Sequence, residues 1–460
     1  EGLSAPGRFE DVSFTVRAGE ILGLGGIAGS GQQDIVRALF GLVPVAAGHI
    51  SIGGRRVPID GPGAAIRAGI VYLPSDRRGE GMFLPHSVSD NIVLPHVKDW
   101  SRLGILDRAR EDEAVARQVA ALRVKTPSVA QPVELLSGGN QQKVAFARWL
   151  LADPKVCIFD EPTQGVDVGT KLEIYTLIRQ LADRGIAVIV VSSDVMELIG
   201  LSDRVEVVAN GRIVDEMAGA EATEQRIVGA AVKASVRATG NTESPRERHV
   251  RPGAGLAGRY GASLMLLAII TLACAYAALA TPYFFTPRNF ASLAIQIAPL
   301  VIVALGQFTV VVLGGIDLST GPNISLATAI ASFLIATDSV TGIPAGIAIV
   351  LLAGLAVGCV NGILVEWLRL PDLVATLSTF SAVAGLALIV RPAPGGLVDP
   401  GFAGLVLTRL GYVPVAFIVA VAAVIAYEVL LLRGRLGMRL YSVGSSPDAA
   451  FVAGGPTSRV

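Results

Sequence analysis

The residues that could do chemistry lie in two nearby segments. The segment Ser137–Gly139 opens a polar helical stretch with small residues and bare backbone amides. Such a helix start can receive a phosphate on its N–H groups and on the positive end of its dipole. Asp160 and Glu161 end the apolar run Val156–Phe159, 23 residues after Ser137. Two carboxylates at a strand end can hold Mg²⁺ and polarise an attacking water. Together the segments predict phosphate and magnesium chemistry.

A glycine-rich turn earlier in the chain is a second place for a phosphate. Gly26–Gln33 follows an apolar strand and opens a helix, with the glycine spacing of GxxxxGK[ST]. Gln32 replaces the lysine, which removes a charge-assisted contact of about 1.5–3 kcal/mol, and Gln33 replaces the Mg²⁺-ligating hydroxyl. We expect weak or non-productive nucleotide binding; an ordinary glycine turn is the alternative. The predicted binding residues are Gly26, Gly29, Ser30, Gly31, Gln32 and Gln33.

These motifs resemble the signature, Walker B motif and P-loop of ABC ATPases. The resemblance implies ATP and Mg²⁺ as cofactors, with Asp160 holding the metal and Glu161 orienting or deprotonating water. The glutamine that the family places after the strand Ile70–Pro74 is Ser75, and its switch histidine is Ser193. The resemblance further assigns Ser137, Gly138, Gly139 and Gln141 to the signature and Asp167 to the D-loop.

A narrower resemblance concerns the second ATPase domain of ribose-type sugar importers. Leu136–Lys143, Asp160–Gly169 and Gly69–Arg77 carry it, and in that family this domain typically has a degenerate P-loop. Ser75 and Gln164 depart from the usual residues. Family members work as sandwiched pairs, with each nucleotide between one P-loop and the other domain's signature. An intact signature beside a degenerate loop therefore implies a partner ATPase domain with an intact P-loop.

The elements that must position these motifs alternate short β-branched runs with polar helical stretches, which predicts an α/β domain over residues 1–232. A polar Thr, Ser, Glu, Arg and Pro stretch over 233–258 predicts a cytoplasmic linker. The expected strands are Ile21–Leu24, Ile70–Leu73, Val156–Phe159, Ala187–Val191 and Val205–Val208, and Arg108–Leu122 is an expected surface helix.

The remaining residues, 259–460, predict a polytopic all-α transmembrane domain. Of 38 Lys and Arg residues, 30 lie at or before Arg259, and long uncharged runs follow. Basic residues flanking the first and last runs favour a cytoplasmic start and end. We therefore predict a multi-pass protein of the bacterial inner membrane with its ATPase domain in the cytoplasm. The six expected spans are 261–281, 293–313, 320–337, 344–365, 373–390 and 413–432.

This second part resembles the permease of the same importers. The supporting residues are Thr281–Thr286, Gly314–Ser319 and Leu440–Ala450. Such permeases usually have about ten spans and such ATPase subunits two nucleotide domains. The chain is therefore expected to be a truncated or central section of an ATPase–permease fusion.

Asp317 is the candidate residue on the solute path. It lies in a Gly-Gly-Ile-Asp-Leu-Ser break between two apolar runs. A carboxylate at membrane depth is costly unless it faces protein, water or a polar partner. The alternative is a helix-packing turn or a loop near the membrane surface.

The segment after Ser446 predicts a short helix. Ser446 can cap it, Pro447 suits its first position, and Asp448 lies in its favourable first turn. Ala449 and Ala450 give it an apolar side. This resembles the coupling helix that a permease inserts into a groove of its ATPase; a plain connecting turn is the alternative.

The preferred function is ATP-driven import of a monosaccharide, a pentose or hexose. The implied partners are the second ATPase domain, the remaining or a second copy of the permease, an extracytoplasmic sugar-binding protein and membrane lipid; the net charge of zero suggests no nucleic acid. One alternative is an importer of nucleosides or another neutral polar solute. Another is a membrane protein that senses ATP without driving transport.

Overall fold

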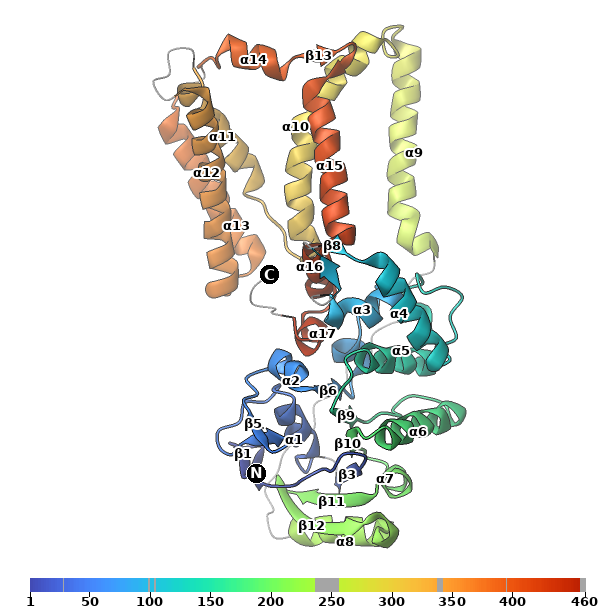
Figure 1. The fold of residues 1–460 in the computed structure, drawn as a ribbon. Coiled ribbons are helices and arrows are strands. Elements are labelled where there is room, and N and C mark those ends of the chain that lie inside the picture. The colour runs from blue at the N-terminus through green and yellow to red at the C-terminus, as the bar shows by residue number, and fades with distance from the viewer. Residues whose placement is uncertain are drawn as a thin grey trace. The chain divides into compact units, whose positions relative to one another are not determined.

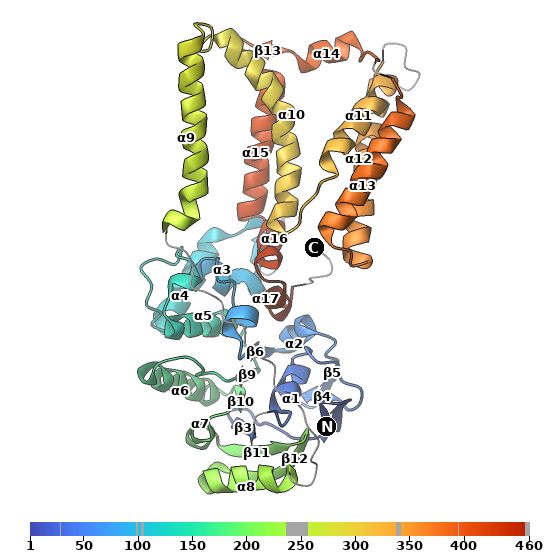
Figure 2. The ribbon, with the colours of Figure 1, turned by 180° about the vertical axis from the view of Figure 1, so that it is seen from behind.

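The computed structural model describes residues 1–27, 29–97, 100–102, 105–235, 256–336, 342–393 and 395–455. The chain divides into two compact units, Glu1–Asn241 with Leu430–Val460, and Thr242–Val429. Figure 1 labels their helices and strands, and Figure 2 shows them from behind. Most of the predicted linker lies outside the described residues, although the flanking helices α8 and α9 extend into its two ends.

A six-stranded sheet organises the first unit, in the order β12-β11-β3-β10-β9-β6. Its five consecutive strands from β11 to β6 are parallel, and β12 pairs antiparallel with β11 at the edge. The central strands are buried on both faces, as expected for apolar β-branched runs covered by helices. All five predicted strands are confirmed. The sheet consists of β3 (Ile21–Gly26), β6 (Ile70–Leu73), β9 (Val156–Asp160), β10 (Ala187–Val191), β11 (Arg204–Ala209) and β12 (Arg212–Ala218).

The helices of this unit include the predicted surface helix, which is α4, Arg108–Ala121. The others before the second unit are α1 (Gln32–Leu39), α2 (Pro62–Ala68), η1 (Arg77–Gly81), α3 (Val88–Val93), η2 (Leu94–His96), η3 (Val133–Leu135), α5 (Gly138–Leu150), α6 (Val168–Asp183), α7 (Val195–Leu201), η4 (Gly219–Glu221) and α8 (Glu224–Ser235). The short strands are β1 (Leu3–Ala5), β2 (Phe9–Val12), β4 (Ile50–Ile52), β5 (Arg55–Val57), β7 (Ser101–Arg102) and β8 (Ile105–Leu106).

Two helices near the end of the described residues pack with the first unit, although they follow the predicted membrane spans in sequence. Helices α16 (Arg435–Ser445) and α17 (Pro447–Val452) belong to the first unit. Met438 and Val452 join the main hydrophobic core of that unit. Sequence order alone could not show this, because burial of one apolar helix side depends on a surface formed by distant residues.

The second unit is helical, as predicted for a membrane domain. All six expected spans coincide with helices. Within the described residues, four are long and apolar enough to cross a membrane: Pro287–Val312, Ile343–Trp367, Asp372–Val390 and Val415–Arg433. The third expected span is α11, whose 15 residues extend about 22 Å, less than a hydrocarbon core of about 30 Å. The elements are α9 (Leu256–Ala280), α10 (Pro287–Val312), α11 (Thr320–Leu334), α12 (Ile343–Gly362), η5 (Ile363–Trp367), α13 (Asp372–Val390), α14 (Pro400–Val406), β13 (Arg409–Leu410), β14 (Val413–Pro414) and α15 (Val415–Arg433).

Candidate functional site

Asp160, at the carboxyl end of β9, is buried with 1% of its surface exposed. It lies beside the glycine-rich turn Gly26–Gln33, called the nucleotide loop below. Its Oδ1 accepts a hydrogen bond from Gln33 Nε2 at 3.2 Å, and its Oδ2 accepts one from the Tyr72 hydroxyl at 2.8 Å. Burial raises the pKa of this carboxyl, while hydrogen bonds from Tyr72, Gln33 and Ser75 partly oppose the shift. The structure therefore brings three separately predicted positions together, Asp160, Gln33 and Ser75.

The nucleotide loop has the backbone of a phosphate cradle. Gly29 and Gly31 have φ angles of +82° and +104°, and open space lies where a side chain of Gly29 would be. Gln32 does not replace the missing lysine, because its Nε2 donates back to the Ile27 carbonyl at 3.2 Å and the side chain is buried. Helix α1 thus begins at the loop with its amides available but without a cation from Gln32.

The pocket beside this loop is lined by two carboxylates. Its volume is about 140 Å³, and the described residues that line it include Asp34 and Glu161 but no Lys or Arg. Asp34 is ion-paired with Arg8, which lines an adjoining cavity together with Gly29, Ser30 and Gly31. The Glu161 carboxylate opposes a triphosphate unless a cation accompanies it. The lining residues are Gly26, Gly29, Gly31, Gln32, Gln33, Asp34, Glu161, Val191, Ser192 and Ser193.

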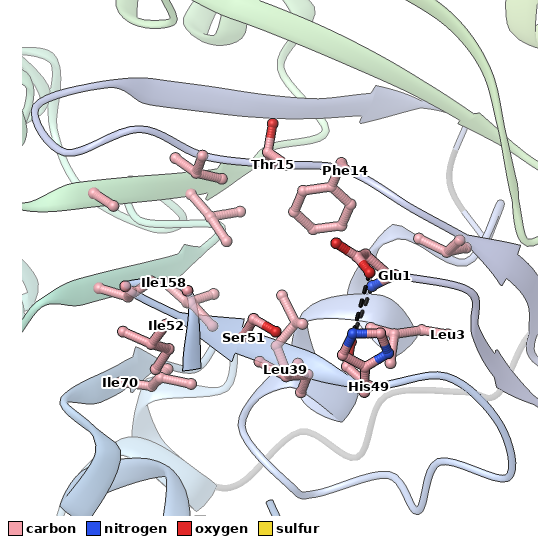
Figure 3. A pocket seen from close by; sticks show the side chains of 18 residues that line it. Glu1, Leu3, Phe14, Thr15, Leu39, His49, Ser51, Ile52, Ile70 and Ile158 are labelled. Atoms are coloured by element: carbon pink, nitrogen blue, oxygen red, sulfur yellow. Dashed lines mark hydrogen bonds and ion pairs between the residues drawn. The ribbon is translucent and has the colours of Figure 1, made fainter. Parts of the chain in front are cut away.

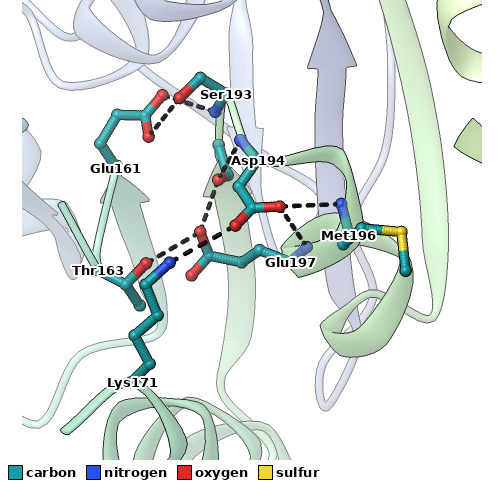
Figure 4. A network of polar contacts seen from close by, with 8 residues as sticks. Glu161, Thr163, Lys171, Ser193, Asp194, Met196 and Glu197 are labelled. Atoms are coloured by element: carbon teal, nitrogen blue, oxygen red, sulfur yellow. Dashed lines mark hydrogen bonds and ion pairs between the residues drawn. The ribbon is translucent and has the colours of Figure 1, made fainter. Parts of the chain in front are cut away.

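Glu161 is held at the same edge of the sheet by the switch position (Figure 4). Its two carboxylate oxygens accept from the Ser193 N–H at 2.6 Å and from the Ser193 hydroxyl at 3.1 Å. Its backbone has a φ of +50°, a sparsely populated conformation for a residue with a side chain. Burial raises the pKa of Glu161, and the bonds from Ser193 partly oppose the shift. Ser193 thus orients the carboxylate that is predicted to act on water.

A second acid lies behind this pair. Glu197 is 5% exposed and accepts from the hydroxyls of Ser192 at 2.6 Å and Thr163 at 3.2 Å. Its Oε1 has no partner among the described residues, and burial raises its pKa. The sequence analysis missed Glu197, although an acid four residues after the switch position was a visible signal.

The signature residues lie on a different element, the start of α5. Ser137 precedes the helix, and its hydroxyl accepts from Asn140 Nδ2 at 2.9 Å rather than capping it. Gln141 is buried and donates to the carbonyls of Val133 and Leu136, both at 3.2 Å, so it fixes the loop before the helix.

A cation lies at this helix start. Arg77 Nη1 donates to Gln142 Oε1 at 3.1 Å, and Arg77 Nη2 lies 3.4 Å from where a Cβ of Gly138 would be. Arg77 Nε is buried with no hydrogen-bond partner among the described residues. Burial lowers the pKa of Arg77, with Arg78 adding to the effect. Arg77 also escaped the sequence analysis, which took it only as part of a family motif.

The D-loop position, Asp167, caps α6. Its carboxylate accepts from the Thr170 N–H at 3.0 Å and from the Thr170 hydroxyl at 2.8 Å. Gly139 is packed tightly against the same threonine, since a Cβ there would lie 2.6 Å from Thr170 Cγ2. Asp167 and Gly139 therefore both contact one side chain, which holds the start of α5 beside the start of α6.

The residues present fit a magnesium nucleotide in part. The Asp160 carboxylate and the side-chain amide oxygen of Gln33 are the kind of oxygen ligand that Mg²⁺ takes, with phosphates and waters completing its shell. In this structure the amide nitrogen of Gln33 faces Asp160. The described residues contain no cluster of three or more His, Cys, Asp or Glu that could hold a metal alone. The loop can offer backbone amides to phosphates, and Arg8, the cation in the adjoining cavity, is paired with Asp34.

A larger apolar cavity of about 350 Å³ lies at the opposite, amino end of the parallel strands (Figure 3). Ile70 and Val156 line it where their strands begin. Its acid and base, Glu1 and His49, pair with each other at 3.1 Å. Ligands of open parallel sheets bind at the carboxyl ends of the strands, so this cavity is not the nucleotide site.

The predicted coupling helix is confirmed as a helix, α17. Ser446 Oγ accepts from the Ala449 N–H at 3.2 Å and donates to the Gly79 carbonyl of η1 at 2.9 Å. Ala449 and Ala450 are buried against Phe83. Gly454 ends the segment with a φ of +77°. The helix that the sequence predicted from its cap therefore packs in a groove of the ATPase fold.

A buried arginine holds the residues of the first unit that α17 contacts. Arg148 is 1% exposed, and it donates to the Gly81 carbonyl at 2.6 Å, the Asn91 carbonyl at 2.8 Å and Asn91 Oδ1 at 2.8 Å. Its guanidinium carbon lies 5.3 Å from the centre of the Phe83 ring. Burial lowers the pKa of Arg148. These contacts place Phe83 where α17 meets it.

Asp317, in the second unit, is engaged by its own turn. Its Oδ1 accepts from the Ser319 N–H at 2.8 Å and from the Ser319 hydroxyl at 2.6 Å. Asn361 Nδ2 donates to that hydroxyl at 2.8 Å, and Thr379 donates to Asn361 Oδ1 at 2.7 Å. This hydrogen-bond chain joins the start of α11 to α12 and α13. It fits the helix-packing alternative, and a place on the solute path stays a prediction.

Two family models match the chain. Residues 9–164 match the ABC transporter family, and residues 289–460 match the family described as the branched-chain amino acid transport system / permease component. The ribose import ATP-binding protein RbsA 1 of Streptomyces avermitilis is 45% identical over 245 residues, 53% of this chain and 47% of the relative. The ribose import ATP-binding protein RbsA of Bacillus subtilis is 46% identical over 228 residues, 50% of this chain and 46% of the relative.

One solved structure, an ATP-binding cassette of an ABC transporter in the ADP conformation, aligns with 51% of this chain and 95% of its own at 19% identity and a TM-score of 0.43.

The chain spans about half the length of the curated relatives it matches. The matches to the relatives and to the two family models confirm the resemblance that the motifs predicted. One chain thus combines a match to the ABC transporter family with a match to a permease family, and its first part is similar to ribose import ATP-binding proteins.

Proposed function

We propose that this chain is the ATPase–permease of an ABC importer that takes up a monosaccharide. The observation that carries the proposal is the seating of α17, from the permease-family match, against Phe83 of the ATPase fold. Ala449 and Ala450 leave less than 3% of their surfaces exposed there. This contact is what mechanical coupling between nucleotide chemistry and a membrane domain requires.

The two edges of the ATPase domain have different tasks in this proposal. The loop Gly26–Gln33 binds a nucleotide weakly, because Gln32 supplies no charge and the neighbouring Arg8 is paired with Asp34. The start of α5, with Arg77 beside Gly138, serves the nucleotide of a partner ATPase domain that has an intact P-loop. Hydrolysis therefore occurs mainly at the composite site to which this chain contributes its signature.

At its own loop, the chain keeps the carboxylates of a hydrolytic site. Mg²⁺ supplies charge compensation and orients phosphate oxygens when it is bound. Asp160 and the Gln33 carbonyl are the residues that would hold it. Glu161, fixed by Ser193, would orient or deprotonate water, and burial, which raises its pKa, makes its carboxylate a stronger base.

The remaining parts of the proposal are the membrane location and the partners. The four long apolar helices cross the bacterial inner membrane, and the ATPase domain lies in the cytoplasm. An extracytoplasmic binding protein delivers the solute. Alternating access follows from closure of the paired ATPase domains, transmitted by α17.

Uptake in transport-deficient cells tests the proposal. The gene is expressed with those of its partners, and uptake of labelled ribose, xylose, galactose, inositol, a nucleoside and leucine is measured with and without ATP depletion. Leucine is included because the permease family's description names branched-chain amino acids. Energy-dependent accumulation of a monosaccharide supports the proposal. Accumulation of only the nucleoside or leucine changes the solute class, and ATP binding without any accumulation favours the sensing alternative.

A further inference from the structure

An ion pair connects the nucleotide helix with the groove that holds α17. Arg37, in the last turn of α1, donates to the Glu80 carboxylate of η1 through both terminal nitrogens, at 2.8 and 3.2 Å. The two side chains are 30% and 24% exposed, so the pair is partly shielded from water. A bidentate pair fixes both position and angle, unlike a single contact between long side chains.

The nucleotide side of this pair leads to Asp160. Tyr72, fully buried on β6, donates to Asp160 Oδ2 at 2.8 Å. Its ring packs on Phe40, directly after α1, with centroids 5.3 Å apart. Burial opposes the charge of Arg37, yet the Glu80 carboxylate and the nearby Tyr72 hydroxyl raise its pKa on balance. Through its hydroxyl and its ring, Tyr72 thus connects Asp160 with the end of α1, the helix that carries Arg37.

The membrane side of the pair leads to α17. Glu80 belongs to the five-residue π-helix η1, whose neighbouring residue Gly79 accepts the Ser446 hydroxyl at 2.9 Å. The next residue, Gly81, accepts from the buried Arg148 at 2.6 Å. η1 is therefore held from three sides, by α1, by α5 and by α17. A short irregular helix with these anchors moves as one body when one anchor moves.

We propose that the Arg37–Glu80 pair, with Tyr72, is the link that transmits the state of Asp160 to α17. When a ligand approaches Asp160, its carboxylate exchanges the bonds to Gln33 and Tyr72 for new ones. Tyr72 and α1 then shift Arg37, and Arg37 moves η1 against Ser446. Arg37 and Glu80 are positioning residues in this mechanism, since neither touches the nucleotide pocket.

The link rests on the proposed function, because it requires that α17 belongs to a permease. In this mechanism, nucleotide binding at the loop Gly26–Gln33 moves α17 without hydrolysis at that loop. Transmission of this kind needs a demonstrated energetic coupling rather than mere proximity.

The test uses R37Q, E80Q and the double variant in the full chain assembled with its partners. The exposed pair Arg212–Glu10, at 2.6 Å, supplies the matched control variants R212Q and E10Q. One readout is the ratio of ATP hydrolysis with and without solute-loaded binding protein. The other is the ATP-dependent emission change of a fluorophore on F451C, at an exposed position of α17. Melting temperatures identify variants that fail to fold.

Each single variant is expected to lower both responses at least fivefold, and the double variant no further than either single one. The charge-reversed pair R37E with E80R should restore part of the response. Wild-type responses in either single variant, or losses in the double variant that multiply, overturn the link. If the unsubstituted chain shows the emission change but no solute stimulation, the importer function fails while the link stands. No emission change in the unsubstituted chain overturns the link itself.

Discussion

The nucleotide loop and the signature helix lie in one domain, yet they offer a phosphate opposite surroundings. The loop pocket is lined by Asp34 and Glu161, and Arg8, which lines the adjoining cavity, is already paired with Asp34. The start of α5 has Arg77 beside Gly138, with a guanidinium nitrogen whose donor is unused in the described structure. The difference supports the proposal that the start of α5 serves a partner's nucleotide while the loop of this domain binds its own nucleotide weakly.

The most direct way to break this asymmetry is a carboxylate at the signature. G138D places negative charge and bulk where Gly165 and Arg77 already approach. We expect ATP hydrolysis by the assembled transporter to fall about 100-fold, as when a donor to a developing charge is removed. Phosphate release measures it. G200D, at an exposed glycine with open space around it, is the control and should retain activity. Near-normal hydrolysis in G138D would contradict the assigned role of α5.

Overpacking the α17 groove should have the next largest effect. Ala450 is buried against Phe83, so A450W forces α17 out of its seat, and overpacking typically costs about 1–3 kcal/mol. Transport should fall roughly tenfold while nucleotide binding is unchanged. The control is F451W, because Phe451 on the same helix is 41% exposed. Equal loss in both variants would mean that the groove contact is not specific.

Restoring positive charge to the nucleotide loop should strengthen its binding of ATP. Q32K with Q33T should tighten ATP binding by about tenfold or more, because a charged hydrogen bond contributes about 1.5–3 kcal/mol. Titration with a fluorescent ATP analogue measures the affinity. Q225K, on the exposed surface of α8, tests for a general effect of added charge. An unchanged affinity in the double variant would show that the lining carboxylates, and not the missing lysine, determine how weakly the pocket binds ATP.

The smallest expected effect concerns Glu197. Burial raises its pKa in the folded state, so the unfolded chain releases this proton first, and stability falls as pH rises from the unfolded value through the folded one. E197Q removes this dependence. The melting temperature of E197Q minus that of the unsubstituted protein should increase from pH 5 to pH 8 by an amount on the order of 2 °C. The exposed Glu113 provides E113Q as the control, which should show no such trend.

The sequence predicted more of the fold than of the site. Apolar runs gave the five parallel strands, and the Ser446 cap gave α17, because both signals are local. Tyr72 carried no local signal of function, whereas Glu197 and Arg77 lay beside recognised motifs without being singled out. Tyr72 was part of a strand, and only the alignment of β6 beside β9 brings its hydroxyl to Asp160. Contacts of this kind depend on strand order, which spacing along the chain does not encode.

The same limit applies to the second unit. The Gly-Gly-Ile-Asp break was visible, but not the bonds that Ser319, Asn361 and Thr379 form across three helices. The packing of α16 into the first unit also escaped prediction. Helices α16 and α17 follow a membrane-type helix in sequence, yet Met438 and Val452 complete the core of the ATPase unit.

The seating of α17 has a consequence for assembly. The helix and its groove belong to one polypeptide, so their association is unimolecular and its effective concentration is set by chain geometry rather than by expression level. Dilution that separates loosely bound subunits would leave this contact in place. The formation of this contact is therefore independent of how many copies the cell makes.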